Sequence, residues 1–276
     1  MNGRELGVPL TDRGLAYGDG LFETLRWVNG APWALAAHHA RLQTGCAVLG
    51  LPAPTLDELQ AACMAWGAAQ PGLPAAGVLK ILWTAGSGDR GYARPALVTP
   101  RLGIQRSPMP AARPEGLSVV PLAQPGGVGE APWRGLKHLN RLPQVWMRAR
   151  WPVGVDEVLV YDTQGLVHGG SQSNFCWFED GRWFTPALAG DAIAGTVRAQ
   201  LIRRLGVIPA PVSVGRLALA TALVMTNAVR GVEPVIRFGT RRLDAAPARA
   251  LQAAWQDLGA ATAEDWLTVW QSETDR

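Results

Sequence analysis

Gly135-Leu136-Lys137-His138-Leu139-Asn140-Arg141 contains Lys137, one of only two lysines among the 26 basic residues of this chain. An arginine is always charged and can neither act as a base nor form an imine. The amine of a lysine, in contrast, condenses with an aldehyde to form a Schiff base and can then shuttle a proton. Lys137 is therefore a candidate catalytic residue, and an ordinary surface lysine in front of a helix is the alternative.

The other lysine, Lys80, lies in the apolar run 77–83, which predicts a strand. A lysine in such a strand packs its stem on apolar neighbours and keeps its charged head in water. We therefore expect a structural role for Lys80.

Composition limits the class of protein. The 276 residues, of which 48% are hydrophobic and 17% charged, predict a globular chain with one large core or two moderate ones. The net charge of +4 comes from scattered arginines, which suit the anionic groups of a small-molecule substrate better than nucleic acid. Three widely spaced cysteines favour neither a disulfide framework nor a metal site. Without an apolar signal core or a membrane-length apolar run, we expect a cytoplasmic protein that does not bind membranes.

The N-terminal part predicts alternating strands and helices. Residues 21–28 read as a strand, Asn29-Gly30 as a hairpin turn, 35–49 as a helix and 96–101 as a further strand. The loop 85–92 has three glycines and carries Arg90 and Tyr92, so its backbone can bend around a ligand. The proline-rich segment 107–114 predicts a linker between an N-terminal α+β domain, 1–106, and a C-terminal α+β domain, 115–276, which carries Lys137.

The C-terminal part predicts a second sheet. Its expected strands share apolar, β-branched or aromatic sequence and lie at 117–121, 156–162, 166–168, 174–178, 182–185, 223–227 and 231–238. A helix beginning near Gly195 ends at Gly206. Because the first amides of a helix have no partner within it, such a start favours a phosphate.

These pieces include short motifs that occur in the order of one known family. They are Asp12-Arg13-Gly14, 17–24, His38 with Arg41-Leu42, 86–92, 136–141, 156–159, Ser173-Asn174, 195–198 and 226–228. Together they resemble the fold-type IV pyridoxal-phosphate enzymes, which include the D-amino-acid aminotransferases. The runs 136–141 and 86–92 are most similar to the aminodeoxychorismate lyase branch. The resemblance implies a two-domain α+β fold, pyridoxal 5'-phosphate in the cleft between the domains, and a homodimer.

The resemblance also assigns roles to single residues. Lys137 would form the Schiff base with the cofactor and act as the proton shuttle. The further cofactor-binding residues would be Arg41, Asn174, Gly195, Thr196, Val197 and Thr226, with Arg41, the amides of Thr196 and Val197, and Thr226 on the phosphate. The substrate-binding residues would be Arg90, Tyr92, Tyr17 and Asn227, with Arg90 on a carboxylate. Roles for Glu23, Arg26 and His138 stay open.

One position departs from the family pattern. The glutamate that pairs with the ring nitrogen of the cofactor in this family is replaced here by Gly169. His168 is adjacent, but strand alternation directs its side chain to the other face. Ser171 or a water molecule could approach the ring nitrogen, and neither would hold a proton there as a carboxylate does.

The resemblance implies a lyase that converts 4-amino-4-deoxychorismate to 4-aminobenzoate and pyruvate in folate biosynthesis. A transaminase of the same fold, acting on D- or branched-chain amino acids, is the first alternative. A catalytically silent homologue is the second, and the missing glutamate is its main support. Fold alone does not choose among these functions.

Overall fold

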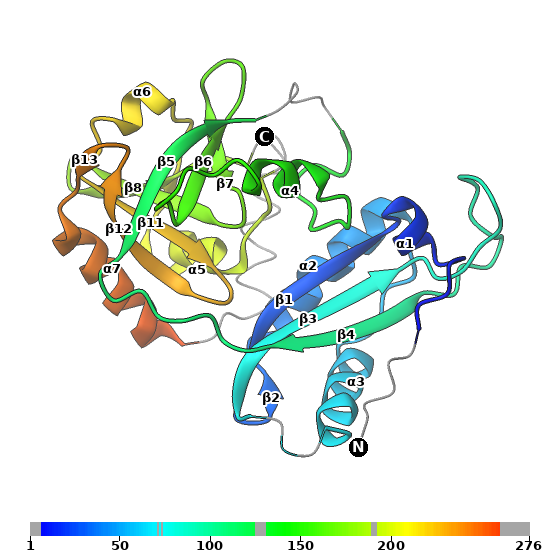
Figure 1. Cartoon of the computed structure of the whole chain (residues 1–276). Helices are drawn as coiled ribbons and strands as arrows, with labels where there is room; N and C mark the ends of the chain where they lie inside the picture. The colour runs from blue at the N-terminus through cyan, green and yellow to red at the C-terminus, as the bar shows by residue number, and fades with distance from the viewer. Residues whose placement is uncertain (1–6, 71, 73, 125–130, 189–191, 260–276) are drawn as a thin grey trace. The chain divides into compact units, whose positions relative to one another are not determined.

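The computed structural model describes residues 7–70, 72, 74–124, 131–188 and 192–259. The chain divides into two compact units (Figure 1). The N-terminal unit comprises Met1–Pro110 with Leu136–Asn140, and the C-terminal unit comprises Ala111–Gly135 with Arg141–Arg276. The segment that carries Lys137 thus belongs to the N-terminal unit, although it lies within the expected C-terminal domain in sequence.

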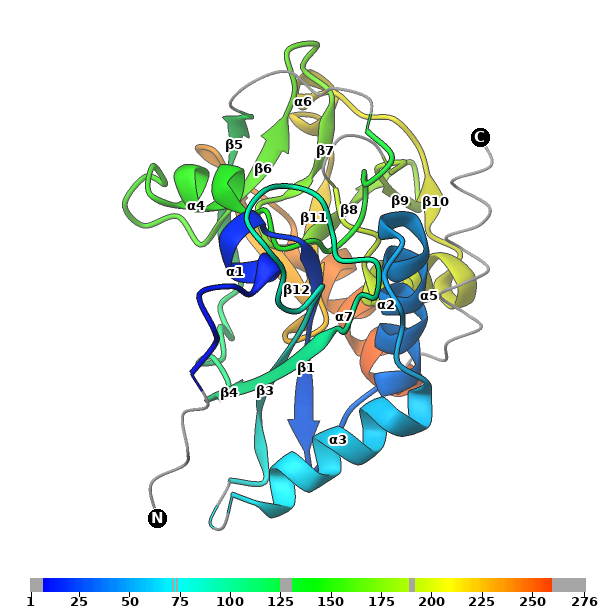
Figure 2. The ribbon, with the colours of Figure 1, turned by 90° about the vertical axis from the view of Figure 1, so that its right-hand side faces the viewer.

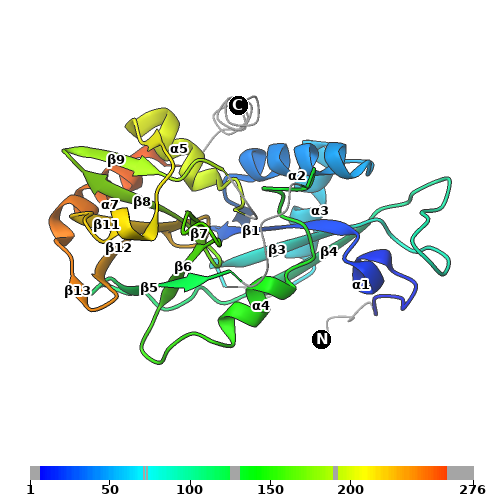
Figure 3. The same cartoon turned by 90° about the horizontal axis from the view of Figure 1, so that it is seen from above.

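The N-terminal unit is built on an antiparallel sheet with the strand order β2-β1-β3-β4. Its strands are β1 (Gly20–Val28), β2 (Ala31–Pro32), β3 (Ala76–Thr84) and β4 (Arg101–Ser107). Its helices are α1 (Arg13–Tyr17), α2 (Leu35–Leu49) and α3 (Leu56–Ala68). Figure 3 shows α2 and α3 on the same side of this sheet.

Local sequence explains several of these elements. Asn29 and Gly30 both have positive φ, as the predicted tight turn between β1 and β2 requires. Thr55 and Glu58 form a capping box at the start of α3. The predicted strand at 96–101 is wrong, because β4 begins only at Arg101. Pro95 and Pro100 have no N–H group to donate to a ladder, so they break the pattern there.

The Lys137 segment pairs with the start of β1. The backbone amide of Phe22 donates to the carbonyl of Lys137 at 2.9 Å, and the amide of Leu139 donates to the carbonyl of Gly20 at 3.0 Å. The side chain of Asn140 donates to the carbonyl of Gly18 at 2.9 Å. These bonds fix the backbone on both sides of the lysine.

The C-terminal unit contains a nine-stranded mixed sheet in the order β10-β9-β8-β11-β12-β5-β6-β7, with β13 paired to β12. Its strands are β5 (Leu117–Ala123), β6 (Glu157–Tyr161), β7 (Val167–Gly170), β8 (Asn174–Glu179), β9 (Arg182–Thr185), β10 (Ile208–Pro209), β11 (Ala222–Asn227), β12 (Gly231–Phe238) and β13 (Arg241–Arg242). Its helices are α4 (Leu142–Arg148), α5 (Thr196–Leu205), α6 (Val214–Leu217) and α7 (Ala245–Leu258). Both units combine helices with sheets, which confirms the predicted α+β class.

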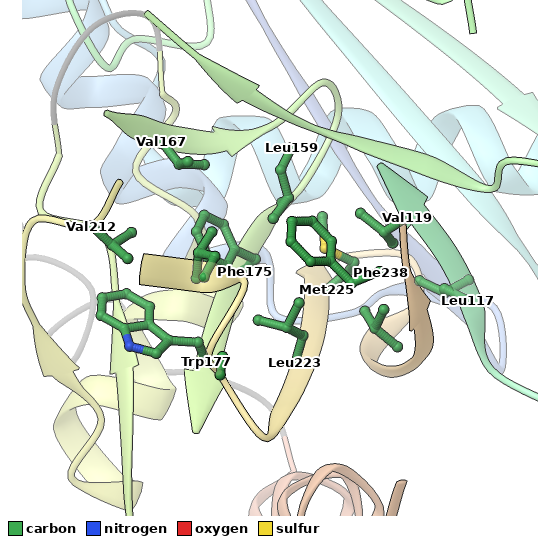
Figure 4. Close-up of a cluster of buried hydrophobic side chains, with 13 residues drawn as sticks. Leu117, Val119, Leu159, Val167, Phe175, Trp177, Val212, Leu223, Met225 and Phe238 are labelled. Atoms are coloured by element: carbon green, nitrogen blue, oxygen red, sulfur yellow. The ribbon is translucent and has the colours of Figure 1, made fainter. Parts of the chain in front are cut away.

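A buried apolar cluster holds β8 and β11 together. Phe175 and Trp177 of β8 pack with Leu223 and Met225 of β11 in this cluster (Figure 4). Burial of each large apolar side chain stabilises the sheet by roughly 1.5–3 kcal/mol. The cluster therefore fixes the register in which the start of β8 meets the end of β11.

The three cysteines, Cys46, Cys63 and Cys176, are buried free thiols. Burial raises the pKa of each thiol, to about 12, 11 and 12 respectively. Within the described residues, no helix has the length and apolar character needed to cross a membrane.

Candidate functional site

Lys137 lies beside an aromatic ring in the N-terminal unit. Its Nζ is 4.3 Å from the centroid of the Phe22 ring. Lys80 Nζ is 5.2 Å from the same centroid, so the two lysines of the chain share one aromatic neighbour. Sequence reasoning missed this position of Lys80, because a strand lysine that pairs across the sheet gives no local signal of it.

A buried ionic cluster lies on the other face of β1. Burial alternates along this strand, and Glu23 falls on its buried face among apolar side chains. Arg41 donates to the Glu23 carboxylate through Nε at 2.8 Å and through Nη2 at 2.5 Å. His38 Nδ1 lies 2.6 Å from Glu23 Oε2. Because His38 and Arg41 are three residues apart on α2, they lie on one helix face and both reach Glu23.

The cluster determines which groups carry charge. Burial alone would raise the pKa of Glu23, but Arg41 and His38 outweigh it and hold that pKa at about 2. Burial lowers the pKa of His38, despite the opposing effect of Glu23, and Arg41 and Lys137 lower it further. A neutral His38 donates from Nδ1 to Glu23, which leaves Nε2 as a buried acceptor with no partner among the described residues. The predicted phosphate ligand Arg41 is therefore held rigidly by a fully ionised carboxylate.

The C-terminal unit brings several predicted cofactor-binding residues together. Thr226 is directly opposite Asn174 in the antiparallel pair of β11 and β8. Asn174 Nδ2 donates to the carbonyl of Ile193 at 2.9 Å. A Cβ on Gly195 would lie only 2.0 Å from Asn174 Oδ1, so this position requires glycine. These contacts connect the ends of two strands to the residue that precedes α5.

The start of α5 offers backbone amides that have no acceptor within the helix. Gly195 is its N-cap, and no side chain caps the helix. The first amides of a helix, here those of Thr196 and Val197, have no partner within the helix. Thr226 Oγ1 is buried and has no hydrogen-bond partner among the residues that the structure describes. Uncapped helix amides and a free hydroxyl are the donor set that a phosphate dianion requires.

Gly169 lies on β7 opposite Val160 of β6. A Cβ there would be 3.3 Å from the carbonyl oxygen of Ser173, a tight contact. His168 Nε2 is 2.8 Å from Asp162 Oδ2, so that ring is held by a carboxylate of its own hairpin.

A second buried carboxyl group, Glu157, lies on β6 and was not identified from sequence. Its oxygens accept hydrogen bonds from the hydroxyls of Ser171 and Ser173, both at 2.8 Å, and from the amide of Val158. Burial raises the pKa of Glu157, although these hydrogen bonds oppose the rise. Leu159 is directly opposite Gly170, so these two residues are on the same face of the sheet. Glu157 is two residues before Leu159 and therefore has its side chain on that face, whereas Gly169 is on the other face. The Ser171 hydroxyl that could approach a ring nitrogen donates here to Glu157.

The predicted substrate-binding residues lie in both units. Tyr92 is 87% exposed, and its ring centroid is 5.5 Å from that of Tyr17. Arg90, in the same loop, is also exposed. Asn227 Oδ1 accepts hydrogen bonds from the amides of Val229 and Arg230, so it also shapes the turn after β11. The position of the cofactor in a cleft between the domains stays a prediction.

Known proteins share this chain's sequence pattern and fold. A Vibrio harveyi aminodeoxychorismate lyase is 27% identical over 239 residues, which cover 83% of this chain and 86% of the relative. A putative branched-chain-amino-acid aminotransferase of Methanocaldococcus jannaschii is 25% identical over 247 residues, covering 86% and 85%. The crystal structure of 4-amino-4-deoxychorismate lyase from Pseudomonas aeruginosa superposes with a TM-score of 0.79 at 37% identity, covering 91% of this chain and 95% of that one. The family model of amino-transferase class IV matches residues 20–238, and the chain belongs to this family.

Proposed function

We propose that this chain is a pyridoxal-phosphate-dependent carbon–oxygen lyase that converts 4-amino-4-deoxychorismate to 4-aminobenzoate and pyruvate for folate biosynthesis, as a cytoplasmic homodimer. Its family depends on pyridoxal phosphate. The similarity to the Pseudomonas aeruginosa lyase supports the lyase branch. The observation that carries the choice is Gly169, where the family has a carboxylate.

The described residues fit the cofactor. The amides of Thr196 and Val197 and the hydroxyl of Thr226, which has no partner among the described residues, would hold its phosphate, and Gly195 lets the Asn174 side chain pack beside them. Asn174 supports this group from the adjacent strand. Lys137 would hold the aldehyde carbon, and the Glu23–Arg41 pair would contribute a fixed guanidinium. We propose that Lys137 and Arg41 act at the same site as the residues that would hold the phosphate.

The chemistry of the proposed reaction suits Lys137. The bound cofactor would supply an electron sink for this reaction. Lys137 would remove the ring proton beside the amino-bearing carbon and return a proton to the departing enolpyruvyl group, which then becomes pyruvate. Because the product ring is aromatic, the reaction has a driving force that transamination lacks. Arg90 and Tyr92 would bind and orient a substrate carboxylate.

Gly169 favours the lyase over a transaminase, because the two reactions differ in how much they need a carboxylate at the ring nitrogen. A transaminase must hold negative charge on the cofactor ring long enough to reprotonate another atom, so it gains most from a ring nitrogen kept protonated by a carboxylate. The lyase needs that charge only until the leaving group departs. A buried Glu157 does not replace the missing group directly, since its side chain lies on the opposite face from that of Gly169.

A transaminase of the same fold is the second candidate, supported by the similarity to the Methanocaldococcus jannaschii protein. The two candidates differ in whether they accept a keto acid. A silent homologue is the third, and it predicts that the protein does not bind the cofactor productively.

An absorbance titration with pyridoxal phosphate tests the proposal first. We expect a visible band from the Schiff base that is lost in Lys137→Ala and kept in Lys80→Ala, which changes the only other lysine of the chain. Borohydride reduction followed by peptide mapping should label Lys137. A well-folded protein with no band would favour the silent homologue.

Product analysis then separates the two enzymes. Wild type should release 4-aminobenzoate and pyruvate in equal amounts from 4-amino-4-deoxychorismate, with little amino-group transfer to keto acids. Gly169→Glu restores the carboxylate and should raise transaminase activity. Strong transaminase activity already present in wild type would contradict the use of Gly169 as evidence for the lyase.

A further inference from the structure

We propose that Arg13 is a positioning residue that clamps the backbone of the loop 86–95 and thereby presents Arg90 and Tyr92 to the substrate. The proposal rests on the proposed function, in which those two side chains meet a substrate carboxylate. Arg13 lies on α1, and the loop 86–95 follows β3 (Figures 1 and 2). Both belong to the N-terminal unit.

The guanidinium of Arg13 binds consecutive carbonyl groups of this loop. Nη1 donates to the carbonyl of Gly91 at 3.1 Å and to that of Ala93 at 3.0 Å. Nη2 donates to the carbonyl of Tyr92 at 2.8 Å. Nε donates to Asp19 Oδ2 at 2.9 Å. All three guanidinium nitrogens are thus used, and Arg13 is only 3% exposed.

Only an arginine fits this arrangement. The planar guanidinium presents its donors in a fixed fork, whereas a lysine offers a single compact ammonium group on a flexible stem. Hydrogen bonds from a charged donor are also stronger than those between neutral groups. A lysine at position 13 would keep the positive charge and lose the simultaneous hold on Gly91, Tyr92 and Ala93.

Asp19 anchors the clamp at a second point. It also accepts two hydrogen bonds from Arg94, through Nε at 2.9 Å and Nη2 at 2.5 Å. Arg94 Nη1 donates to the carbonyl of Leu49 at the end of α2. Burial would raise the pKa of Asp19, but Arg94 and Arg13 outweigh it and keep that pKa below its usual range. An ionised Asp19 therefore binds both Arg13 of α1 and Arg94 of the loop.

Tyr17 contacts the same loop through its hydroxyl and through its ring. Its hydroxyl accepts a hydrogen bond from the amide of Gly91 at 3.1 Å. The Tyr17 ring lies edge-on to the ring of Tyr92, and the Arg13 guanidinium is 5.0 Å from the centroid of the Tyr17 ring. Gly91 has a φ of 101°, so its backbone can turn inward toward these groups at no steric cost.

The backbone and the side chains of this loop thus have different roles. Its carbonyls face the buried Arg13, while Tyr92 is 87% exposed and Arg90 is exposed as well. Among the residues that the structure describes, none makes a hydrogen bond or an ion pair with the Arg90 guanidinium. Because the backbone of the loop is already fixed, less entropy is lost when its outward side chains bind a carboxylate.

The test compares Arg13→Lys with Arg106→Lys. Arg106 is a matched control, because it too donates to backbone carbonyls of the N-terminal unit, those of Pro74 and Ala76. Hydrogen exchange of the Gly91 amide, which donates to the Tyr17 hydroxyl, should speed up at least about tenfold in Arg13→Lys and stay at the wild-type rate in Arg106→Lys. KM for 4-amino-4-deoxychorismate should rise at least about tenfold in Arg13→Lys, with kcat within about threefold of wild type and the cofactor band unchanged.

Two outcomes would overturn the proposal. If exchange of the Gly91 amide stays at the wild-type rate in Arg13→Lys, Arg13 does not clamp the loop. If exchange rises but KM does not, the loop does not position substrate contacts. Should Arg13→Lys fail to fold, Asp19→Asn weakens the ion pair that orients the Arg13 guanidinium and should also raise exchange of the Gly91 amide; exchange at the wild-type rate there would overturn the clamp. A wild type that makes no 4-aminobenzoate would contradict the proposed function, while the exchange data still judge the clamp independently.

Discussion

Replacing Glu23 by glutamine should destabilise the protein strongly at neutral pH and weakly in acid. The carboxylate is 1% exposed and accepts hydrogen bonds from Arg41 and His38. Glutamine has nearly the same shape, but it carries no charge and directs an NH₂ group toward one of these donors. The change therefore removes the ionic interaction and leaves the volume of the core unchanged.

The pKa of Glu23 gives the magnitude. It lies at about 2 instead of the usual 4.5, and one pKa unit corresponds to about 1.4 kcal/mol. The ionised carboxylate thus contributes about 3 kcal/mol to the free energy of unfolding at pH 7. The same figure is at the low end of the roughly 3–5 kcal/mol lost when one partner of a buried ion pair is removed.

The pH dependence has a definite sign. The folded-state pKa is below the unfolded-state pKa, so the stabilisation is complete above pH 4.5 and is lost as the pH falls toward 2. The difference in unfolding free energy between wild type and Glu23→Gln should fall from about 3 kcal/mol at pH 7 to about 1.4 kcal/mol at pH 3. Urea unfolding followed by tryptophan fluorescence measures this difference across the range.

Glu58→Gln is the control. Glu58 also has a pKa below its usual range, owing to hydrogen bonds from Thr55, but it is exposed and glutamine preserves the capping box. This variant should unfold at the wild-type urea concentration. The reasoning is refuted if Glu23→Gln loses less than about 1 kcal/mol at pH 7, or if its deficit is as large at pH 3 as at pH 7.

Three further predictions concern other positions of the chain. Gly14→Ala should lose about 1–3 kcal/mol in urea unfolding, because the new Cβ would lie 2.3 Å from Thr84 Cγ2. Burial raises the pKa of Glu157 in the folded state, so wild type loses the stabilising contribution of this carboxyl group as the pH rises from 4 to 7. Glu157→Gln has no group that titrates there and should therefore gain stability relative to wild type over this range. A constant difference in unfolding free energy between the two proteins would contradict the prediction. Thr226→Val should weaken binding of pyridoxal phosphate about tenfold without lowering the stability of the apoprotein, since its hydroxyl has no partner among the described residues; unchanged affinity in an absorbance titration would remove Thr226 from the proposed site.

Local sequence was sufficient for many elements of the fold. The strand at 21–28 and the turn at Asn29-Gly30 follow from neighbouring residues alone, and the structure confirms them. The strand predicted at 96–101 failed for a local reason too, because its apolar residues are flanked by Pro95 and Pro100. Such features depend on interactions within a few residues, which sequence patterns record directly.

The sequence by itself also determined the chemistry available to the chain. Lys137 stands out because arginine supplies nearly all other positive charge, and Gly169 removes a carboxylate that the family pattern contains. Neither observation requires coordinates, since both concern which functional groups are present.

Only the tertiary structure decided which of these groups meet. Glu23 and Arg41 are 18 positions apart, and Arg13 and Tyr92 are 79 apart. The two lysines lie near one ring only because β1 pairs both with β3 and with the Lys137 segment. Such contacts depend on strand register and on which side chains are buried, and burial of the apolar core sets both across distances that no local pattern encodes.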